Sequence, residues 1–265
     1  MLNLTFDRYR SGDSIIHHLD PRVKVAATIL FIVSTALLPD GAWLALALSW
    51  GCVLIACAAS GLGLGYLLRR SLVALPFALA AVTMLFNLPG QPLFVAHIGP
   101  WQLTASDAGL VRFASILVRS WVSVQMAILL TATTRFPDLM HALRHLRVPG
   151  LLIAIISFMF RYLFVVVDEA IRLMRARQAR SARPAGGGGG GSVAWRARVT
   201  GHMTGQLLLR SFERSDRIYS AMLARGFRGR FVTVNPHMMQ RRDWIMGGLA
   251  VIALIMMQVV ARLRG

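Results

Sequence analysis

The chain has 265 residues, 56% of them hydrophobic, and its 29 lysines and arginines outnumber its 11 aspartates and glutamates, giving a formal net charge of +18. A soluble domain is rarely so apolar and so cationic at once, so the composition argues against one and the two properties must be separated along the chain. Its two cysteines, Cys52 and Cys57, lie in one apolar run, so no disulfide framework is implied.

Five apolar runs are long enough, at about 1.5 Å of helix per residue, to cross a bilayer, although the shortest is marginal. They are Val23–Leu38, Ala42–Ser60, Ser71–Leu88, Phe113–Thr134 and Trp244–Ala261. Three arginines precede the first run and two lie in the 61–70 loop, whereas the 39–41 turn and the 89–109 loop have none. Because basic residues concentrate in cytoplasmic loops, we expect a cytoplasmic amino terminus and four spans that end in the cytoplasm at residue 135.

The next apolar stretch, Leu151–Val167, would be a further span by hydropathy alone. Arg161 stands in its middle, and an arginine at a helix centre costs about 2.5–3.5 kcal/mol on insertion scales. A crossing would also place the 15 arginines between Arg172 and Arg242 outside. We therefore expect a helix that lies at the cytoplasmic membrane surface, with Trp244–Ala261 as the final span. The predicted fold class is an all-α polytopic membrane protein with about five transmembrane helices and long cytoplasmic surface helices.

The sequence predicts three parts. Residues 1–134 form a membrane part with four spans, residues 135–242 a cytoplasmic region of long helices, and residues 243–265 the final transmembrane helix. A glycine-rich tether at 184–192 divides the cytoplasmic region, since its six consecutive glycines, Gly186–Gly191, favour a flexible linker. No Gly-Lys-Ser/Thr follows these glycines, so they do not form a phosphate loop.

Two long helices are expected on either side of the tether. The first runs over Gly150–Ser181 and includes Asp168 and Arg172 as a local ion pair at i, i+4. The second begins after Ser192, which can cap it, and runs to about Arg225. Each helix ends in an arginine between small residues, and the two arginines are 45 positions apart: Ala179-Arg180-Ser181 and Ala224-Arg225-Gly226.

These arginines have two interpretations. An ordinary solubilising charge at a helix C-terminus, which the helix dipole favours, would explain either one alone. Small neighbours also leave a guanidinium free to enter a groove and bind a carboxylate with both of its arms. The same ending on two consecutive helices favours the second interpretation, contact with a partner that has two equivalent sites.

No catalytic or metal site is predicted. His141 and His145 lie four apart and could share a metal, but no third ligand is evident, so a solvated helix face is favoured. No phosphate-binding motif occurs, so ATP hydrolysis would have to come from another protein. Arg112 and Arg119 lie on one face of the fourth span, where an arginine either serves function or pairs inside the protein.

Three segments together resemble the transmembrane T component of energy-coupling-factor (ECF) transporters, most closely its cobalt/nickel branch, the CbiQ-type permease. They are His18-Leu19-Asp20-Pro21-Arg22-Val23-Lys24, Phe160-Arg161-Tyr162 through Ala179-Arg180-Ser181, and Leu209-Arg210-Ser211 through Ala224-Arg225-Gly226-Phe227, the last being the most specific. The pairs Arg161-Tyr162 and Ala221-Met222 favour the metal branch over the vitamin branch. The six-glycine tether departs from the family pattern.

The resemblance implies a non-catalytic subunit of an ATP-driven cobalt uptake transporter in the bacterial inner membrane. Two ATPase subunits, which hold ATP and Mg²⁺, would contact the helix ends at Ala179, Arg180, Ser181, Ala224, Arg225 and Gly226. A substrate-binding membrane subunit, the S component, would contact the apolar half of the first long helix at Leu151, Phe158, Arg161, Tyr162 and Val165. The chain itself would bind no cofactor and no metal, the cobalt or nickel ion being held by a partner, and its other contacts would be lipid and a small accessory membrane subunit.

Two alternatives remain open from the sequence. The same role in a nickel or vitamin ECF transporter is the nearer one. The more distant one is a membrane-anchored basic protein that binds RNA or ribosomes, which would require salt-dependent nucleic-acid binding by residues 168–242. Arginine-rich cytoplasmic flanks are common in membrane proteins, so we expect no nucleic-acid partner.

Overall fold

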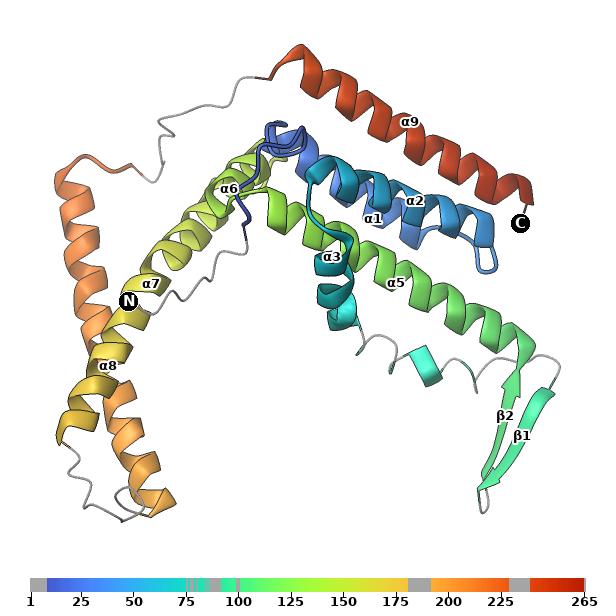
Figure 1. Ribbon diagram of the computed structural model, residues 1–265. Coiled ribbons are helices and arrows are strands. Elements are labelled where there is room, and N and C mark those ends of the chain that lie inside the picture. Colours follow the sequence, from blue (N-terminus) through green and yellow to red (C-terminus); the bar gives the residue numbers. More distant parts are fainter. Residues whose placement is uncertain are drawn as a thin grey trace. The chain divides into compact units, whose positions relative to one another are not determined.

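The computed structural model describes residues 9–74, 76, 79, 81–83, 85, 92–98, 101–180, 192–228 and 239–264 (Figure 1). Its helices are α1 (Pro21–Ala36), α2 (Trp43–Ser60), α3 (Leu64–Ser71), α5 (Asp107–Thr133), α6 (Phe136–His145), α7 (Gly150–Arg180), α8 (Val193–Ala224) and α9 (Arg241–Arg264), with a 3-10 turn at Leu72–Ala74. The expected class, an all-α polytopic membrane protein, is confirmed. One antiparallel hairpin, β1 (Pro92–Ile98) with β2 (Trp101–Ser106), stands in the loop before α5 and was not expected.

The chain folds as two compact units. One comprises Met1–Leu146 with Asn235–Gly265, and the other Arg147–Val234. The first unit therefore includes α6, which packs on α1, together with α9. The second unit consists of α7 and α8 with their flanking residues. Residues 184–191 of the expected tether lie outside the described residues.

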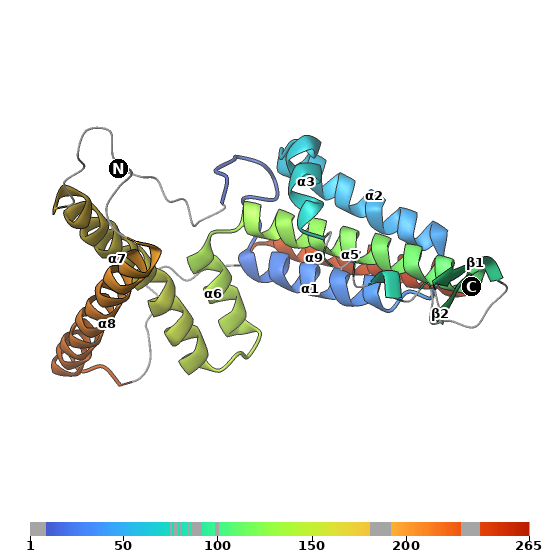
Figure 2. The same ribbon diagram turned by 90° about the horizontal axis from the view of Figure 1, so that it is seen from below.

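The core of the first unit is built by α1, α2, α5 and α9, which run alongside one another (Figure 2). Phe31, Val53 and Val122 bring α1, α2 and α5 together in one buried cluster. Leu46 and Met257 belong to a second cluster, which joins α2 to α9. Apolar contacts thus hold four helices in one bundle.

Four described helices are long and apolar enough to cross a membrane, over Trp43–Ser60, Asp107–Thr133, Gly150–Arg180 and Arg241–Leu263. Helix α1 has 16 residues, or about 24 Å, which is marginal against a hydrocarbon core of about 30 Å. The third expected span, 71–88, begins at the last residue of α3 and continues in the 3-10 turn, and its further described residues, 76, 79, 81–83 and 85, are helical. The location of 151–167 at the membrane surface stays a prediction.

Buried polar contacts fasten α1 to its neighbours at the end where the chain enters the bundle. Asp20 caps α1 by accepting from the backbone N–H of Arg22 at 2.8 Å, and Pro21 occupies the first helical turn. The backbone N–H of Asp20 donates to Asp243 Oδ1 at 3.0 Å, which ties α1 to α9. Lys24 Nζ donates to the carbonyl of Thr133 at 3.2 Å, which ties α1 to the last turn of α5. The amino-terminal segment that carries the family resemblance therefore joins three helices.

At the 39–41 turn, the two arginines of α5 meet a carboxylate. Arg119 Nη2 donates to Asp40 Oδ1 at 2.8 Å, and Arg112 Nε lies 3.6 Å from Asp40 Oδ2. The structure therefore supports the pairing interpretation of Arg119 over a functional one.

Candidate functional site

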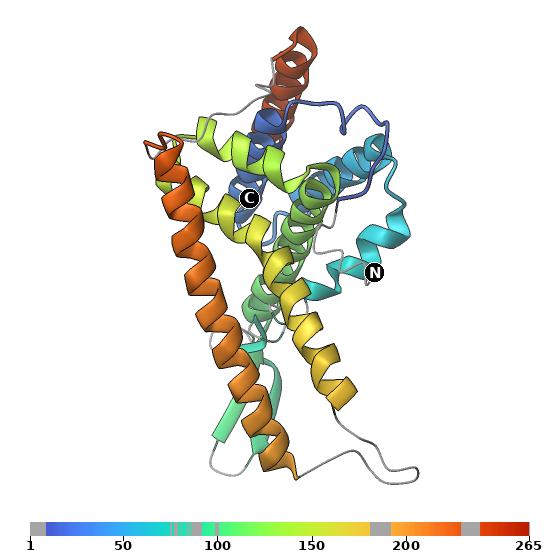
Figure 3. The same cartoon turned by 90° about the vertical axis from the view of Figure 1, so that its left-hand side faces the viewer.

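The second unit is organised by one carboxylate of α7 that binds two arginines of α8. Arg210 Nη1 donates to Glu169 Oε1 at 3.0 Å, and Arg214 Nη2 donates to Glu169 Oε2 at 2.6 Å. Arg210 and Arg214 are one helical turn apart and so reach the same side of α8. Figure 3 shows α7 and α8 crossing, and these bonds hold the two helices together.

Hydrogen bonds from Arg214 and Arg210 hold the pKa of Glu169 below its usual range. The carboxylate therefore stays ionised throughout the physiological pH range. The local pair expected from the sequence, Asp168 with Arg172, is not among the ion pairs of the described residues. The acidic residue beside it, Glu169, reaches across to α8 instead, and spacing along α7 could not predict that long-range contact.

A second contact sets the two helices antiparallel. Arg177 Nη1, near the end of α7, donates to Thr200 Oγ1, near the start of α8, at 3.2 Å. Earlier residues of α7 therefore lie beside later residues of α8. Beyond the ion pairs at Glu169, the end of α8 comes against the apolar half of α7.

The first expected contact triplet lies at the exposed end of α7. Ala179 and Arg180 are both exposed, and Arg180 is the last residue of the helix. Ser181 lies outside the described residues. The exposed guanidinium at a helix C-terminus agrees with the expected placement, while its contact with a partner stays a prediction.

The second triplet closes α8 in a defined turn. The N–H of Gly226 donates to the carbonyl of Leu223 at 2.9 Å, and the N–H of Phe227 donates to that of Met222 at 3.0 Å. This pair of bonds is the Schellman motif, which needs a left-handed residue after the cap. Gly226 supplies it with φ of +77°, so the chain leaves the helix directly after Arg225 in a fixed direction.

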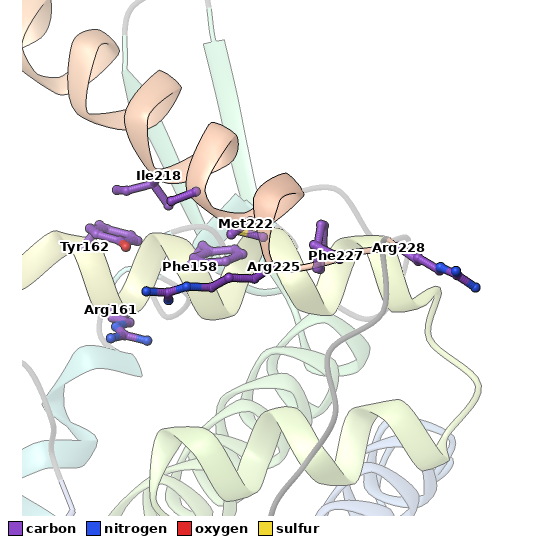
Figure 4. Close-up of a pocket in the computed structure, with 10 residues that line it drawn as sticks. Phe158, Arg161, Tyr162, Ile218, Met222, Arg225, Phe227 and Arg228 are labelled. Carbon is purple, nitrogen blue, oxygen red and sulfur yellow. The ribbon is translucent and has the colours of Figure 1, made fainter.

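An open groove of about 740 Å³ lies where the end of α8 meets α7 (Figure 4). It is lined by Phe158, Arg161, Tyr162, Ile218, Ala221, Met222, Arg225, Gly226, Phe227 and Arg228. The structure thus brings Arg225 and Gly226, expected at an ATPase contact, together with three residues expected at an S-component contact. The other two residues of that set, Leu151 and Val165, are exposed and do not line the groove.

The spacing along α7 explains this meeting. Phe158, Tyr162 and Glu169 follow at i, i+4 and i+11, which places them on one face of the helix. Because Glu169 binds α8, the two aromatic residues face α8 as well, and their rings stack with centroids 6.0 Å apart. The sequence does contain a signal for the groove: Glu169 lies on the same face of α7 as the aromatic residues, so a partner helix bound to Glu169 would also cover them.

Within the described residues, no group of three or more His, Cys, Asp or Glu side chains is arranged to hold a metal ion. The histidine pair of α6 makes other contacts. His141 accepts from Arg22 Nη2 at 3.0 Å through its Nε2, and His145 Nδ1 lies 3.2 Å from the carbonyl of His141. The contact with Arg22 on α1 favours a structural role for His141.

Several known proteins are similar to this chain in sequence. The family model CbiQ, described as cobalt transport protein, matches residues 12–238. The energy-coupling factor transporter transmembrane protein EcfT of Lacticaseibacillus paracasei is 28% identical over 263 residues, covering 94% of this chain and 95% of that protein. The EcfT of Heliobacterium modesticaldum is 30% identical over 236 residues, covering 86% and 85%. The cobalt transport protein CbiQ of Rhodobacter capsulatus is 28% identical over 152 residues, covering 57% and 59%.

Proposed function

The chain belongs to the CbiQ family of cobalt transport proteins and is the transmembrane T component of an energy-coupling-factor transporter, and we propose that it links two ATPase subunits to a substrate-binding membrane subunit during cobalt uptake. Family membership favours this class over the RNA-binding alternative. The name of the Rhodobacter capsulatus relative and the Arg161-Tyr162 pair support cobalt as the substrate, with nickel or a vitamin as the alternatives.

One observation carries the proposal: the ion pair between Glu169 and Arg214 lies the same number of residues before each of the two proposed coupling arginines, Arg180 and Arg225. Arg180 is 11 residues beyond Glu169 on α7, and Arg225 is 11 residues beyond Arg214 on α8. At about 1.5 Å per residue, each arm reaches about 16 Å past the ion pair. Two arms of equal length that start from one fixed point match a partner with two equivalent sites.

The mechanism follows from these arms. Each coupling arginine binds an acidic group of one ATPase subunit, since a guanidinium at a helix end can bind a carboxylate through two hydrogen bonds. ATP and Mg²⁺ bind to the ATPase subunits, whose closure moves the two helix ends. The bonds of Glu169 hold the crossing together, so that motion reaches the opposite arms instead of being lost in sliding.

The apolar half of α7, on the other side of the crossing from Arg180, carries the proposed contact with the S component. Leu151 and Val165 are exposed, as such a contact requires, and Phe158, Arg161 and Tyr162 lie beside the end of α8. Displacement of α8 against this segment would reorient the S component, which holds the cobalt ion. A small accessory membrane subunit and inner-membrane lipid complete the proposed surroundings.

The test is a pair of charge reversals in the reconstituted transporter. Arg180→Glu with Arg225→Glu is expected to abolish ATP-dependent cobalt uptake, because both acidic partners then face carboxylates. The matched control is Arg175→Glu with Arg198→Glu, which reverses two exposed arginines of the same helices outside the two small-Arg-small triplets. Uptake by the first variant at the wild-type rate would contradict the coupling role.

Membrane topology has a separate test. A cysteine in place of Arg198 is expected to resist an impermeant thiol reagent added outside intact cells, because α8 is proposed to be cytoplasmic. A cysteine in place of Ala96, in the β1 strand of the loop that lacks basic residues, should react. The reverse pattern would overturn the proposed orientation.

A further inference from the structure

We propose that Arg10 and Arg70, whose guanidinium groups both contact the ring of Tyr66, bind the phosphate of an anionic phospholipid. Arg10 precedes α1 and Arg70 belongs to α3, so both lie in the first unit and take no part in the contacts assigned to α7 and α8. The inference goes beyond the proposed function. It uses only the membrane class of the protein, since α2 and α5 are long and apolar enough to cross a bilayer.

Two cations share one aromatic ring. Arg10 Cζ lies 4.3 Å from the ring centroid of Tyr66, and Arg70 Cζ lies 5.5 Å from it. Arg70 Nη1 also donates to Tyr66 Oη at 2.7 Å. None of the ion pairs among the described residues includes either arginine. Two guanidinium groups this close repel each other, so an anion bound by both stabilises the pair.

The backbone of Arg10 is held in place. Its N–H donates to the carbonyl of Ala132 at 3.0 Å, and its own carbonyl lies 2.9 Å from His17 Nε2. The preceding ring, that of Tyr9, has the guanidinium carbon of Arg135 at 4.9 Å from its centroid. A side chain on a fixed backbone loses less conformational freedom on binding, so the site is arranged in advance for an anion with several acceptor oxygens.

The backbone of Arg70 lies within the depth of the membrane. Helix α3 packs against α5 (Figure 1), and Ser71 Oγ accepts from Trp121 Nε1 at 2.8 Å. Trp121 stands 12 residues, or about 18 Å, before the last residue of α5. The Arg70 side chain returns one turn along α3 to Tyr66, where Arg10 is bonded to the end of α5. This is how an arginine snorkels from apolar surroundings to the headgroup phosphates.

The exposed surface of α3 favours lipid over a cytoplasmic protein partner. Leu64, Leu68 and Leu72 are all exposed, and their spacing of four residues places them in one row along the helix. Such a row is stable beside acyl chains, and the phosphate layer then lies at the end of α3 that carries Tyr66. A soluble partner would have to reach Tyr66 through the headgroups, whereas a lipid phosphate is already there.

The experiment measures phosphatidylglycerol that stays bound to the purified transporter complex, by native mass spectrometry. Arg10→Gln and Arg70→Gln are each expected to lower retention about fivefold, the effect of removing one cation near an anionic lipid. Arg69→Gln is the matched control, because it removes the neighbouring exposed arginine of α3, about 100° around the helix from Arg70. This control should retain phosphatidylglycerol as the wild type does, and the wild type should bind phosphatidylcholine less.

Equal losses in Arg69→Gln and Arg70→Gln would overturn the site, because they would show a general attraction of basic residues to anionic lipid. Equal binding of phosphatidylcholine and phosphatidylglycerol by the wild type would overturn it too, as would displacement of the lipid by inorganic phosphate at matched concentration. Loss of lipid only in variants that unfold at a lower temperature would have the same meaning.

A protein contact has its own signature. If the wild type retains no phosphatidylglycerol and Arg70 becomes shielded from phenylglyoxal only when a partner subunit joins, the proposal is wrong. Co-purification of the ATPase subunits, measured on the same samples, reports on the proposed function separately.

Discussion

Arg214 donates to Glu169 at 2.6 Å, and this bond joins the two helices of the second unit at a point 11 residues before Arg180 on α7 and 11 residues before Arg225 on α8. A partner that moved one arm would turn the other only if the helices were fixed where they cross. In the proposed function this bond therefore has a mechanical role, although isolated surface ion pairs contribute little to folding.

The first prediction concerns this ion pair. Glu169→Gln should lower cobalt uptake per ATP hydrolysed several-fold, because α7 and α8 lose the ion pairs that join them at their crossing. The temperature of thermal unfolding should stay nearly unchanged, because the four-helix bundle of the first unit keeps all its contacts. Glu213→Gln is the control, because Glu213 is an exposed carboxylate of α8 that forms no ion pair with α7 among the described residues. The exchange Glu169→Arg with Arg214→Glu should restore part of the cobalt uptake per ATP hydrolysed. Failure to restore it would count against the ion pair as the fixed point between the two helices.

The second prediction is that the contact between α7 and α8 at Glu169 stays intact in mildly acidic solution. The pKa of Glu169 is lowered in the folded chain, so its contribution is complete above the unfolded pKa and is lost only as the pH falls through the lower, folded pKa. The unfolded value is about 4.3. Spin labels at residues 175 and 219 should therefore report one distance distribution from about pH 8 to about pH 5. A broadening near neutral pH would show that another group holds the helices.

The third prediction contrasts two glycines of the α8 segment. Gly226→Ala places a side chain at φ of +77°, which costs an L residue about 1–2 kcal/mol and should loosen the turn after Arg225. Gly205→Ala lies inside the helix with nothing within 4 Å of the added Cβ, so it should stabilise α8 by about 1 kcal/mol. Thermal unfolding and uptake, measured on both variants, should move in opposite directions, and parallel losses would contradict the assigned turn.

Local patterns predicted most of the fold. The apolar runs at 23–38, 42–60, 113–134 and 244–261 gave α1, α2, α5 and α9, and Ser192 marked the start of α8 as expected, whereas α3 lies in the expected 61–70 loop. The hairpin was not predicted, because a lack of basic residues indicates on which side of the membrane a loop lies and not its secondary structure, although Pro92–Ile98 contains Phe, Val and Ile, which favour strands. Helix α6 was assigned to the cytoplasmic region, and its packing on α1 depends on contacts that no local pattern contains.

The sequence located the two helix ends of the candidate site but not the contact between the helices. Arg180 and Arg225 lie at helix ends as expected, because small-Arg-small recurs there, while their contact with ATPase subunits stays a prediction. The crossing was not, since Glu169 and Arg214 are 45 positions apart in the chain and the carboxylate had a neighbour, Asp168, with a suitable local partner. Helical spacing predicts which residues share a face, but only the packed structure shows which face meets the other helix.

The last prediction concerns Lys24, the single lysine of the chain. Its Nζ donates to the carbonyls of His17 and Thr133, and its side chain is buried between α1 and the end of α5. Lys24→Met keeps a long apolar stem but leaves both carbonyls without this donor, and a buried unpaired carbonyl costs about 1–3 kcal/mol. We therefore expect the first unit to unfold at a lower temperature in detergent, with little change in the arms of the second unit. An amine-reactive probe should leave Lys24 unlabelled in the native protein and should label it on unfolding; rapid labelling of Lys24 in the native protein would refute its burial.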